Sequence, residues 1–362
     1  MTVNKRGILF TIHHLAGLFT GLFILLMSLS GSVLIFRHEL DQKPVVAQTS
    51  SPDIPVDSAY RLIRQYYPHA QISSCNLPDG PADPLSFFIY DASWQNGEKA
   101  LEVFLHPQTD KRLGSRGGSD DPGNNFMSWL SKFHNSLLLD KTGEWLLGFF
   151  AMLFLVSLVT GLFLFRKSLL PVLLFRRSAW RTNNLHQLVG VYALLFNLLI
   201  AVTGFWMQRY VFKKEFYQSY DFSMTIKPSP AYPYRFDSAY AAVKSRYPDF
   251  TAYVVYFAQG TKGKTAVYGS RSSNAYIHSK KFADVIFLDS SGAVSKTRFI
   301  NEISAGDRYD IINSQLHMGR YGGYGIKILY CLFGLSGSVL SITGFRLWRK
   351  RKRRSAVLTS SR

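Results

Sequence analysis

The stretch IHHLAGL occupies residues 12–18, and LHQLVGV at residues 185–191 repeats its pattern. In each stretch a histidine is followed four residues later by a glycine, and apolar residues fill most of the other positions. An imidazole in hydrocarbon costs free energy, so a histidine within an apolar run usually faces a bundle interior where something binds it. The two stretches therefore predict a membrane protein whose two halves place a histidine at equivalent positions.

Two further histidines, His134 and His317, precede apolar runs and complete the pattern. Each of the four histidines is followed at a fixed distance by a Ser-Gly or Thr-Gly pair. The distance to the glycine is 18 residues from His13 to Gly31 and from His186 to Gly204, and 27 residues from His134 to Gly161 and from His317 to Gly344. Matched registers predict two pairs of ligands for something held between helices, His13 with His186 and His134 with His317.

Apolar residues make up 47% of the 362 residues and concentrate in four runs, at about 8–36, 144–165, 185–208 and 326–348. Each run is long enough to cross ~30 Å of hydrocarbon as a helix. The first run could be a signal peptide, but it exceeds the usual apolar segment of ~7–15 residues, and no small-x-small cleavage site follows it. We therefore interpret it as a retained membrane anchor.

Fifteen lysines and arginines gather on one side of the four runs: before the first, in the connection 166–181, and at the end of the fourth and after it. The positive-inside rule predicts that both termini and this connection are cytoplasmic, and that the two long loops lie on the opposite side of the membrane. The same cations supply most of the formal charge of +19. The basic balance therefore indicates topology and contact with membrane lipid, and no nucleic-acid-binding module accompanies it.

The two long loops share a pattern, because VDSAY at 56–60 and FDSAY at 236–240 are 180 residues apart. Each begins a predicted helix that ends at Tyr-Pro, and β-rich segments with turn signals follow. We expect each loop to be a small α+β domain, a helix against an antiparallel sheet. Since each half would start and end in the cytoplasm, the halves are expected to be parallel repeats about an axis along the membrane normal.

The predicted fold class is a mainly α membrane protein, with four transmembrane helices as two parallel-related repeats and two periplasmic α+β domains. The segments are a first transmembrane helix (1–38), a first periplasmic domain (39–142), a second helix (143–166), a cytoplasmic basic loop (167–184), a third helix (185–208), a second periplasmic domain (209–325), a fourth helix (326–348) and a basic cytoplasmic tail (349–362).

The stretches at 12–18 and 185–191, with the Thr-Gly pairs that precede an aromatic residue and an arginine, resemble the PepSY-associated transmembrane family. The resemblance covers nearly the whole chain and is greatest to the ferrisiderophore (ferrioxamine-type) reductases and iron-regulated membrane proteins of Gram-negative inner membranes. It implies PepSY-like periplasmic domains, b-type haems on histidines and reduction of iron in the periplasm. An insertion around Gly260–Lys281 departs from the family's compact pattern.

Two axial imidazoles can hold one haem between facing helices, so the registers and the resemblance together predict two haem b groups with His13, His186, His134 and His317 as iron ligands. His14 is a competing ligand beside His13. Gly17 and Gly190 lie on the same helical faces as their histidines and would leave room for a flat porphyrin. Close packing between helices is the alternative use of these small residues.

Cations near the ligands are candidate partners for haem propionates. Arg320 follows His317 by three residues and could serve the outer haem, and Arg181 could serve the inner one. Both could equally be ordinary membrane anchors.

A haem near each membrane face would let electrons cross the bilayer, with the cofactor carrying the chemistry. No nucleotide-binding glycine motif follows a strand in a cytoplasmic segment, so the electron donor is expected to be separate: a quinol, a flavin or a reductase. The expected function is reduction of a ferric siderophore or another ferric chelate, with release of iron and with catalytic residues unassigned. A haemless sensor or peptidase regulator, and a cytochrome b subunit that serves a partner protein, are the alternatives.

Overall fold

The structure is a computed structural model that describes residues 5–41, 43–46, 55–91, 100–109, 111–117, 125–174, 185–213, 229, 235–258, 263–272 and 281–360. The chain folds into two compact units. The helical unit comprises Met1–Arg37, Ser131–Asp221 and Leu316–Arg362, and the sheet unit comprises His38–Leu130 and Phe222–Gln315. Each unit therefore takes segments from both halves of the chain.

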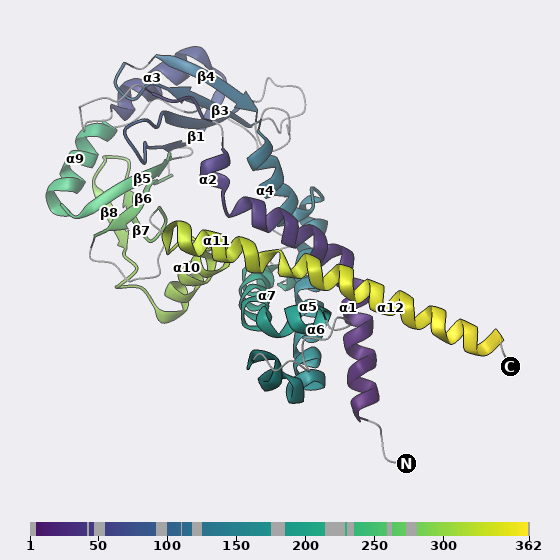
Figure 1. Ribbon diagram of the computed structural model, residues 1–362. Coiled ribbons are helices and arrows are strands. Elements are labelled where there is room, and N and C mark those ends of the chain that lie inside the picture. The colour runs from purple at the N-terminus through teal and green to yellow at the C-terminus, as the bar shows by residue number, and fades with distance from the viewer. Residues whose placement is uncertain are drawn as a thin grey trace. The chain divides into compact units, whose positions relative to one another are not determined.

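Long apolar helices build the helical unit (Figure 1). They are α1 (Lys5–Leu34), α5 (Asp140–Leu173), α6 (Leu185–Tyr192), α7 (Leu194–Gln208), α11 (Gly323–Gly334) and α12 (Ser336–Ser360), with the 3-10 helix η2 (Arg209–Phe212) after α7. Four described stretches are long and apolar enough to cross a membrane: Arg6–Leu34, Asp140–Leu173, Leu194–Phe212 and Gly323–Arg353. They correspond to the four apolar runs of the sequence, although the third span begins later than the predicted residue 185.

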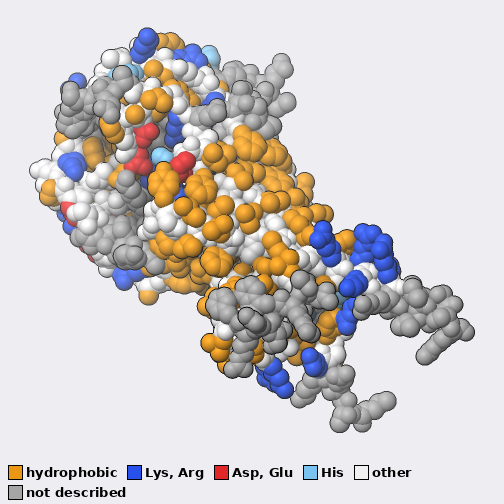
Figure 2. All heavy atoms as spheres, in the orientation of Figure 1, with side chains coloured by type: hydrophobic (Ala, Val, Ile, Leu, Met, Phe, Trp, Pro, Cys, Tyr) orange, Lys and Arg blue, Asp and Glu red, His pale blue; other side chains and the backbone are white. Residues whose placement is uncertain are grey.

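The surface of these helices is apolar. Leu22 and Phe19 on α1 are 70% and 67% exposed, and Leu195 on α7 is 81% exposed. Figure 2 shows hydrophobic side chains over much of the visible face of this unit, and lysine and arginine side chains near the end of α12. A continuous apolar surface of this kind suits contact with lipid, because in water it would favour aggregation.

Single residues interrupt the third and fourth apolar stretches. Ala193 lies between α6 and α7, and Leu335 lies between α11 and α12. The Asn197 side chain donates hydrogen bonds to the Ala193 carbonyl and to the Ser336 hydroxyl, both at 2.9 Å. A buried amide in hydrocarbon needs such partners, so Asn197 joins the two interruptions.

An eight-stranded antiparallel sheet forms the sheet unit, in the order β4-β3-β2-β1-β5-β6-β7-β8. Its elements are α3 (Val56–Tyr66), β1 (Ala70–Asn76), β2 (Leu85–Asp91), β3 (Ala100–Leu105), β4 (Arg112–Gly117), α9 (Phe236–Arg246), β5 (Phe250–Tyr256), β6 (Thr265–Arg271), β7 (Asp284–Leu288) and β8 (Val294–Arg298). Three further helices, α2 (Arg37–Leu40), α4 (Phe126–Ser136) and α10 (Ala305–Met318), contain three of the points where the chain passes between units.

The sheet joins the two loops directly. The sequence predicts a helix and antiparallel strands in each loop, and these elements are present, but the two loops do not form separate sheets. Strand β1 pairs with β5, with Cys75 opposite Val255. An edge strand exposes unpaired backbone groups, and pairing β1 with β5 satisfies them. One core that includes Phe87 and Phe250 extends over both loops.

Helices α3 and α9 exchange their caps. The Asp237 carboxylate accepts hydrogen bonds from the backbone N–H groups of Val56 (2.9 Å) and Asp57 (3.1 Å). In return, the Asp57 carboxylate accepts bonds from the N–H groups of Phe236 (2.9 Å) and Asp237 (3.1 Å). Each aspartate therefore caps the start of the other helix, where a negative charge is favourable.

Candidate functional site

The four predicted histidines lie on four different elements of the helical unit. His13 is on α1, His134 on α4, His186 on α6 and His317 on α10. Each imidazole lies against one of the Ser-Gly or Thr-Gly pairs of the sequence. In each case the histidine in contact differs from the histidine that precedes the pair by 18 or 27 residues in the sequence. That preceding histidine lies much farther away along its own segment of the chain.

His13 and His186, which we call the first pair, donate to backbone carbonyls. His13 Nδ1 lies 2.8 Å from the carbonyl oxygen of Ser157 on α5. His186 Nδ1 lies 3.1 Å from the carbonyl oxygen of Leu340 and 3.0 Å from the hydroxyl of Thr343, both on α12. A carbonyl only accepts, so Nδ1 carries the proton in both rings when they are neutral.

His134 and His317, the second pair, bond to hydroxyls. His134 Nδ1 is 2.8 Å from Ser30 Oγ on α1, and His317 Nδ1 is 2.9 Å from Thr203 Oγ1 on α7. Both hydroxyls already donate their proton to a carbonyl of their own helix, at 2.8 Å and 2.6 Å. They therefore accept from the imidazole, and Nδ1 is again the protonated nitrogen.

Burial keeps the second pair neutral. The pKa of His134 is lowered to about 4, mainly by burial and further by the charge that His317 would carry. Burial also lowers the pKa of His317 to about 4. Neutral imidazole is the form that binds metal ions.

All four Nε2 atoms keep a free lone pair. With Nδ1 protonated, Nε2 of a neutral imidazole is an acceptor, and no hydrogen bond from another described residue occupies it. An imidazole whose Nδ1–H is held by a carbonyl or hydroxyl is fixed in tautomer and orientation, which is how proteins prepare histidine to bind a metal.

Glycine makes these contacts possible. A Cβ atom added to Gly161 would lie 3.0 Å from His13 Cε1, and one added to Gly204 would lie 3.0 Å from His317 Cε1. The corresponding distances are 3.1 Å for Gly31 with His134 and 3.3 Å for Gly344 with His186. The hydroxyls of Ser30, Thr203 and Thr343 bond to an imidazole, whereas Thr160 donates to the Ser157 carbonyl that His13 also contacts. The glycine beside each hydroxyl residue admits the ring. This role explains why the Ser/Thr-Gly pairs recur.

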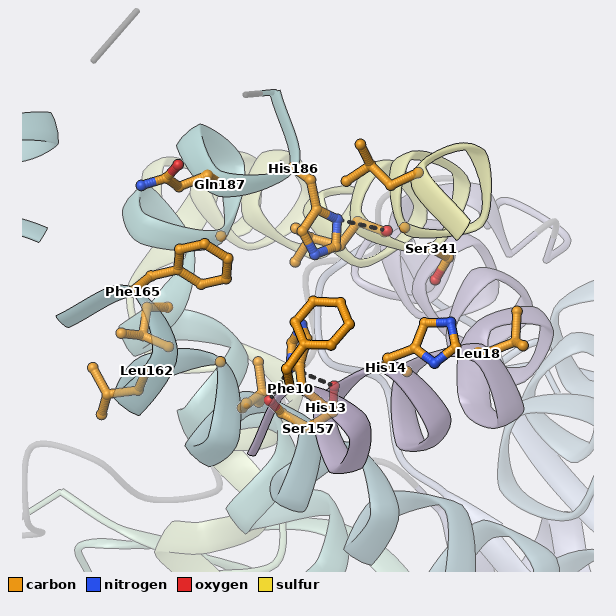
Figure 3. A pocket seen from close by; sticks show the side chains of 18 of the residues that line it. Phe10, His13, His14, Leu18, Ser157, Leu162, Phe165, His186, Gln187 and Ser341 are labelled. Atoms are coloured by element: carbon orange, nitrogen blue, oxygen red, sulfur yellow. Dashed lines mark hydrogen bonds between the residues drawn. The ribbon is translucent and has the colours of Figure 1, made fainter. Parts of the chain in front are cut away.

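The two rings of the first pair face each other (Figure 3). Their centroids are 6.3 Å apart, with an angle of 73° between the ring planes. They line a cavity of ≈ 210 Å³ whose other walls are largely apolar side chains from α1, α5, α6 and α12. His14 also lines the cavity, but its ring stacks on Phe10 instead of facing His186. The geometry thus selects His13 as the partner of His186.

The two pairs lie far apart along the helices. His13 and Ser30, which holds His134, are both on the continuous helix α1. At 1.5 Å per residue, the 17 steps between them correspond to about 25 Å. This separation approaches the ~30 Å thickness of the hydrocarbon core.

The other predicted residues have different surroundings. Gly17 and Gly190 line the cavity, but a Cβ at these positions would meet Ser157 Oγ at 3.4 Å and Leu340 at 3.7 Å, not an imidazole. Arg320 is exposed and follows the end of α10. Arg181 lies outside the described residues.

The first pair can therefore present two imidazoles to one ligand, since its rings face each other across the cavity. The second pair offers two further imidazoles, each with its Nδ1 bonded to a hydroxyl. Within the described ranges, no three side chains of His, Cys, Asp or Glu come together to hold a metal ion. An ion at either pair would take two protein ligands, and its remaining ligands would come from another molecule.

Four membrane-length helices with paired inward-facing imidazoles define a multi-pass membrane protein. The chain belongs to the family of the PepSY-associated TM region, whose model matches residues 10–351. A search of curated proteins found no match to the chain.

Proposed function

We propose that the protein is a haem-b-containing oxidoreductase of a bacterial inner membrane that reduces a periplasmic ferric chelate, such as a ferric siderophore, and releases its iron. The observation that carries the proposal is the state of the four imidazoles: each has its Nδ1–H bound and its Nε2 free. A histidine that binds the iron of a porphyrin uses a free ring nitrogen, and a hydrogen bond at the other nitrogen orients the ring.

The spacing of the first pair supports a shared iron. An imidazole nitrogen lies ~2 Å from a metal ion that it binds. Two imidazoles on opposite sides of one ion then have ring centres about 6 Å apart, and the centroids of His13 and His186 are 6.3 Å apart. A porphyrin supplies the four equatorial nitrogens that two histidines leave open, so this donor set fits haem better than a bare ion.

Haem, when bound, supplies one-electron chemistry at a potential that the protein tunes. Ser157 and Leu340 hold the imidazoles of the first pair through their carbonyls, and Ser30 and Thr203 hold those of the second pair through hydroxyls. These bonds orient the ligands and raise their basicity. The lipid-facing apolar surface keeps both pairs in a low-dielectric environment.

The topology proposed from the cations places the first pair near the cytoplasm and the second near the periplasm. Their separation of about 25 Å along α1 fits transfer of electrons from a cytoplasmic or membrane donor to an acceptor outside. The donor would be a quinol, a flavin or a reductase, and each electron would convert one chelated ferric ion to ferrous. Ferrous iron binds hard oxygen ligands more weakly, and its release follows.

A pyridine haemochrome assay on the purified, folded protein tests the cofactor. We expect two haem b groups per chain, and loss or a changed Soret spectrum of one group in His186→Ala. His38→Ala, which alters a histidine outside both pairs, is the matched control. Folded protein without haem, from cells supplied with haem precursors, would contradict the proposal.

Reoxidation tests the reaction. Protein reduced with dithionite and freed of excess reductant should be reoxidised by a ferric siderophore, with ferrous iron trapped by a chromogenic chelator. Haem-bearing protein that no ferric chelate reoxidises would instead indicate a cytochrome subunit that serves a partner protein.

A further inference from the structure

Arg351 gives the cavity of the first pair a permanent positive charge. Among the described residues that line it, Arg351 near the end of α12 is the only lysine, arginine, aspartate or glutamate. Its guanidinium carbon lies 4.2 Å from the ring centroid of Phe10 on α1, which also lines the cavity. A cation held over an aromatic face is fixed in position while its N–H groups remain available.

The histidine and glycine positions of the cavity correspond between the two halves of the chain: His13 with His186, Gly17 with Gly190 and Gly161 with Gly344. Gly161 and Gly344, which hold the rings of His13 and His186, are 183 residues apart. At the same spacing, Arg351 corresponds to Ser168 on α5. Ser168 is uncharged and does not line the cavity, and neither do the neighbouring cations Arg166 and Lys167.

This difference matters for a flat ligand. Two imidazoles related by a half-turn would accept a planar ligand in either of two orientations that differ by that half-turn. A single cation on one side of the cavity makes the two orientations unequal when the ligand carries negative charge on one edge only. The apolar walls suit the body of such a ligand, and Arg351 suits its charged edge.

We propose that Arg351 binds a carboxylate on the edge of the planar ligand of the first pair and so selects one of the two orientations. This inference rests on the proposed function, because haem b is a flat apolar ring with its propionate carboxylates on one edge. Guanidinium groups bind carboxylates through paired, charge-assisted hydrogen bonds. From the sequence, Arg181 is a candidate for this role or an ordinary membrane anchor, and Arg351 is one of the cations of the basic tail.

Reconstitution with two ligands tests the carboxylate contact. Haem b and its dimethyl ester, in which both carboxylates are blocked, are titrated into haem-depleted full-length protein, and the first site is identified as the one that His186→Ala removes. We expect the wild-type first site to prefer the free acid by about tenfold, as for a hydrogen bond to a charged group. Arg351→Gln should abolish this preference, and Arg351→Lys should retain part of it.

Orientation gives a readout that a merely structural role would not change. The hyperfine-shifted haem methyl signals in the NMR spectrum should show one dominant orientation at the first site in wild-type protein and a mixture in Arg351→Gln. Arg349→Gln is the matched control, because Arg349 is an exposed cation two residues away that does not line the cavity. It should behave as wild type in both experiments.

The outcomes separate the two proposals. Wild-type protein that is folded but binds no haem overturns the proposed function and this inference with it. Wild-type protein that binds haem, with an Arg351→Gln variant that keeps both the preference for the free acid and the single orientation, overturns only the role of Arg351.

Discussion

The two halves of the chain meet in both units, but the two junctions are finished differently. In the sheet unit, β1 pairs with β5 and the aspartates of α3 and α9 cap each other, so the polar groups named at this junction have partners within the chain. In the helical unit, the junction brings His13 opposite His186 with both Nε2 atoms free and a cavity beside them. We call the junction in the sheet unit closed, because its polar groups bond to each other and stabilise the fold. We call the junction in the helical unit open, because its free lone pairs face each other and can bind a ligand.

The largest effect should come from removing a ligand at the open junction. We expect His13→Ala to abolish or strongly weaken cofactor binding at the first pair, because the His13 ring faces that of His186 with its Nε2 free. His14→Ala, which changes the adjacent residue on the cavity wall, should leave two haem groups per chain in the haemochrome assay. The reverse result would assign the ligand to His14.

Closing the space for an imidazole should have the next largest effect. A Cβ at position 161 would lie 3.0 Å from His13, so Gly161→Ala should displace the ring and cost about 1–3 kcal/mol through overpacking. Cofactor affinity and thermal unfolding in detergent measure this. Gly21→Ala is the matched control, since nothing lies within 4 Å of a Cβ there. Equal behaviour of the two variants would mean that the contact with the glycine is unimportant.

The two histidine pairs should respond differently to loss of a hydroxyl. Ser30→Ala removes the hydrogen-bond acceptor of His134 and should weaken the cofactor at the second pair by about 10–100-fold, as for other residues that orient metal ligands. Thr160→Val should change the first pair much less, because His13 donates to the backbone carbonyl of Ser157, which the substitution leaves in place. Titration of each variant with haem measures the difference.

At the closed junction, Asp237→Asn should lower the free energy of unfolding by about 1–2 kcal/mol, since an amide offers one oxygen where the carboxylate accepts from two N–H groups. We expect haem stoichiometry to stay at the wild-type value. Thermal unfolding and the haemochrome assay on the same sample check both statements. Loss of haem together with stability would show that the two junctions are energetically linked.

The smallest effect is a dependence on pH. The pKa of Asp237 is raised above 3.8, mainly by burial and also by the nearby Asp57. The folded state therefore holds this proton more tightly than the unfolded state. This contribution to stability is complete below pH 3.8 and is lost as the pH rises through the raised pKa. The free energy of unfolding, measured from pH 3.5 to 6, should show this loss of stability in the wild-type protein. The Asp237→Asn variant should lack it.

The sequence alone determined the elements that depend on local composition. Apolar length predicted the four membrane-spanning helices, and period-two patterns predicted strands in both loops, because lipid burial and pleating act on neighbouring residues. The histidine registers predicted which positions belong together in the two halves. They did not predict that Ser30-Gly31 holds His134 and Thr160-Gly161 holds His13, because contacts between helices do not follow from spacing along one chain.

Only the tertiary structure decided how these parts combine. Pairing of β1 with β5 merged two expected sheets into one, since two edge strands satisfy each other's backbone groups when they meet. Folding also brought Arg351 from the basic tail onto the wall of the first-pair cavity. From the sequence, this arginine served only as evidence for membrane topology. Local physics sets helices and strands, whereas the protonated nitrogens, the exchanged caps and the place of Arg351 on the cavity wall depend on which surfaces come to face each other.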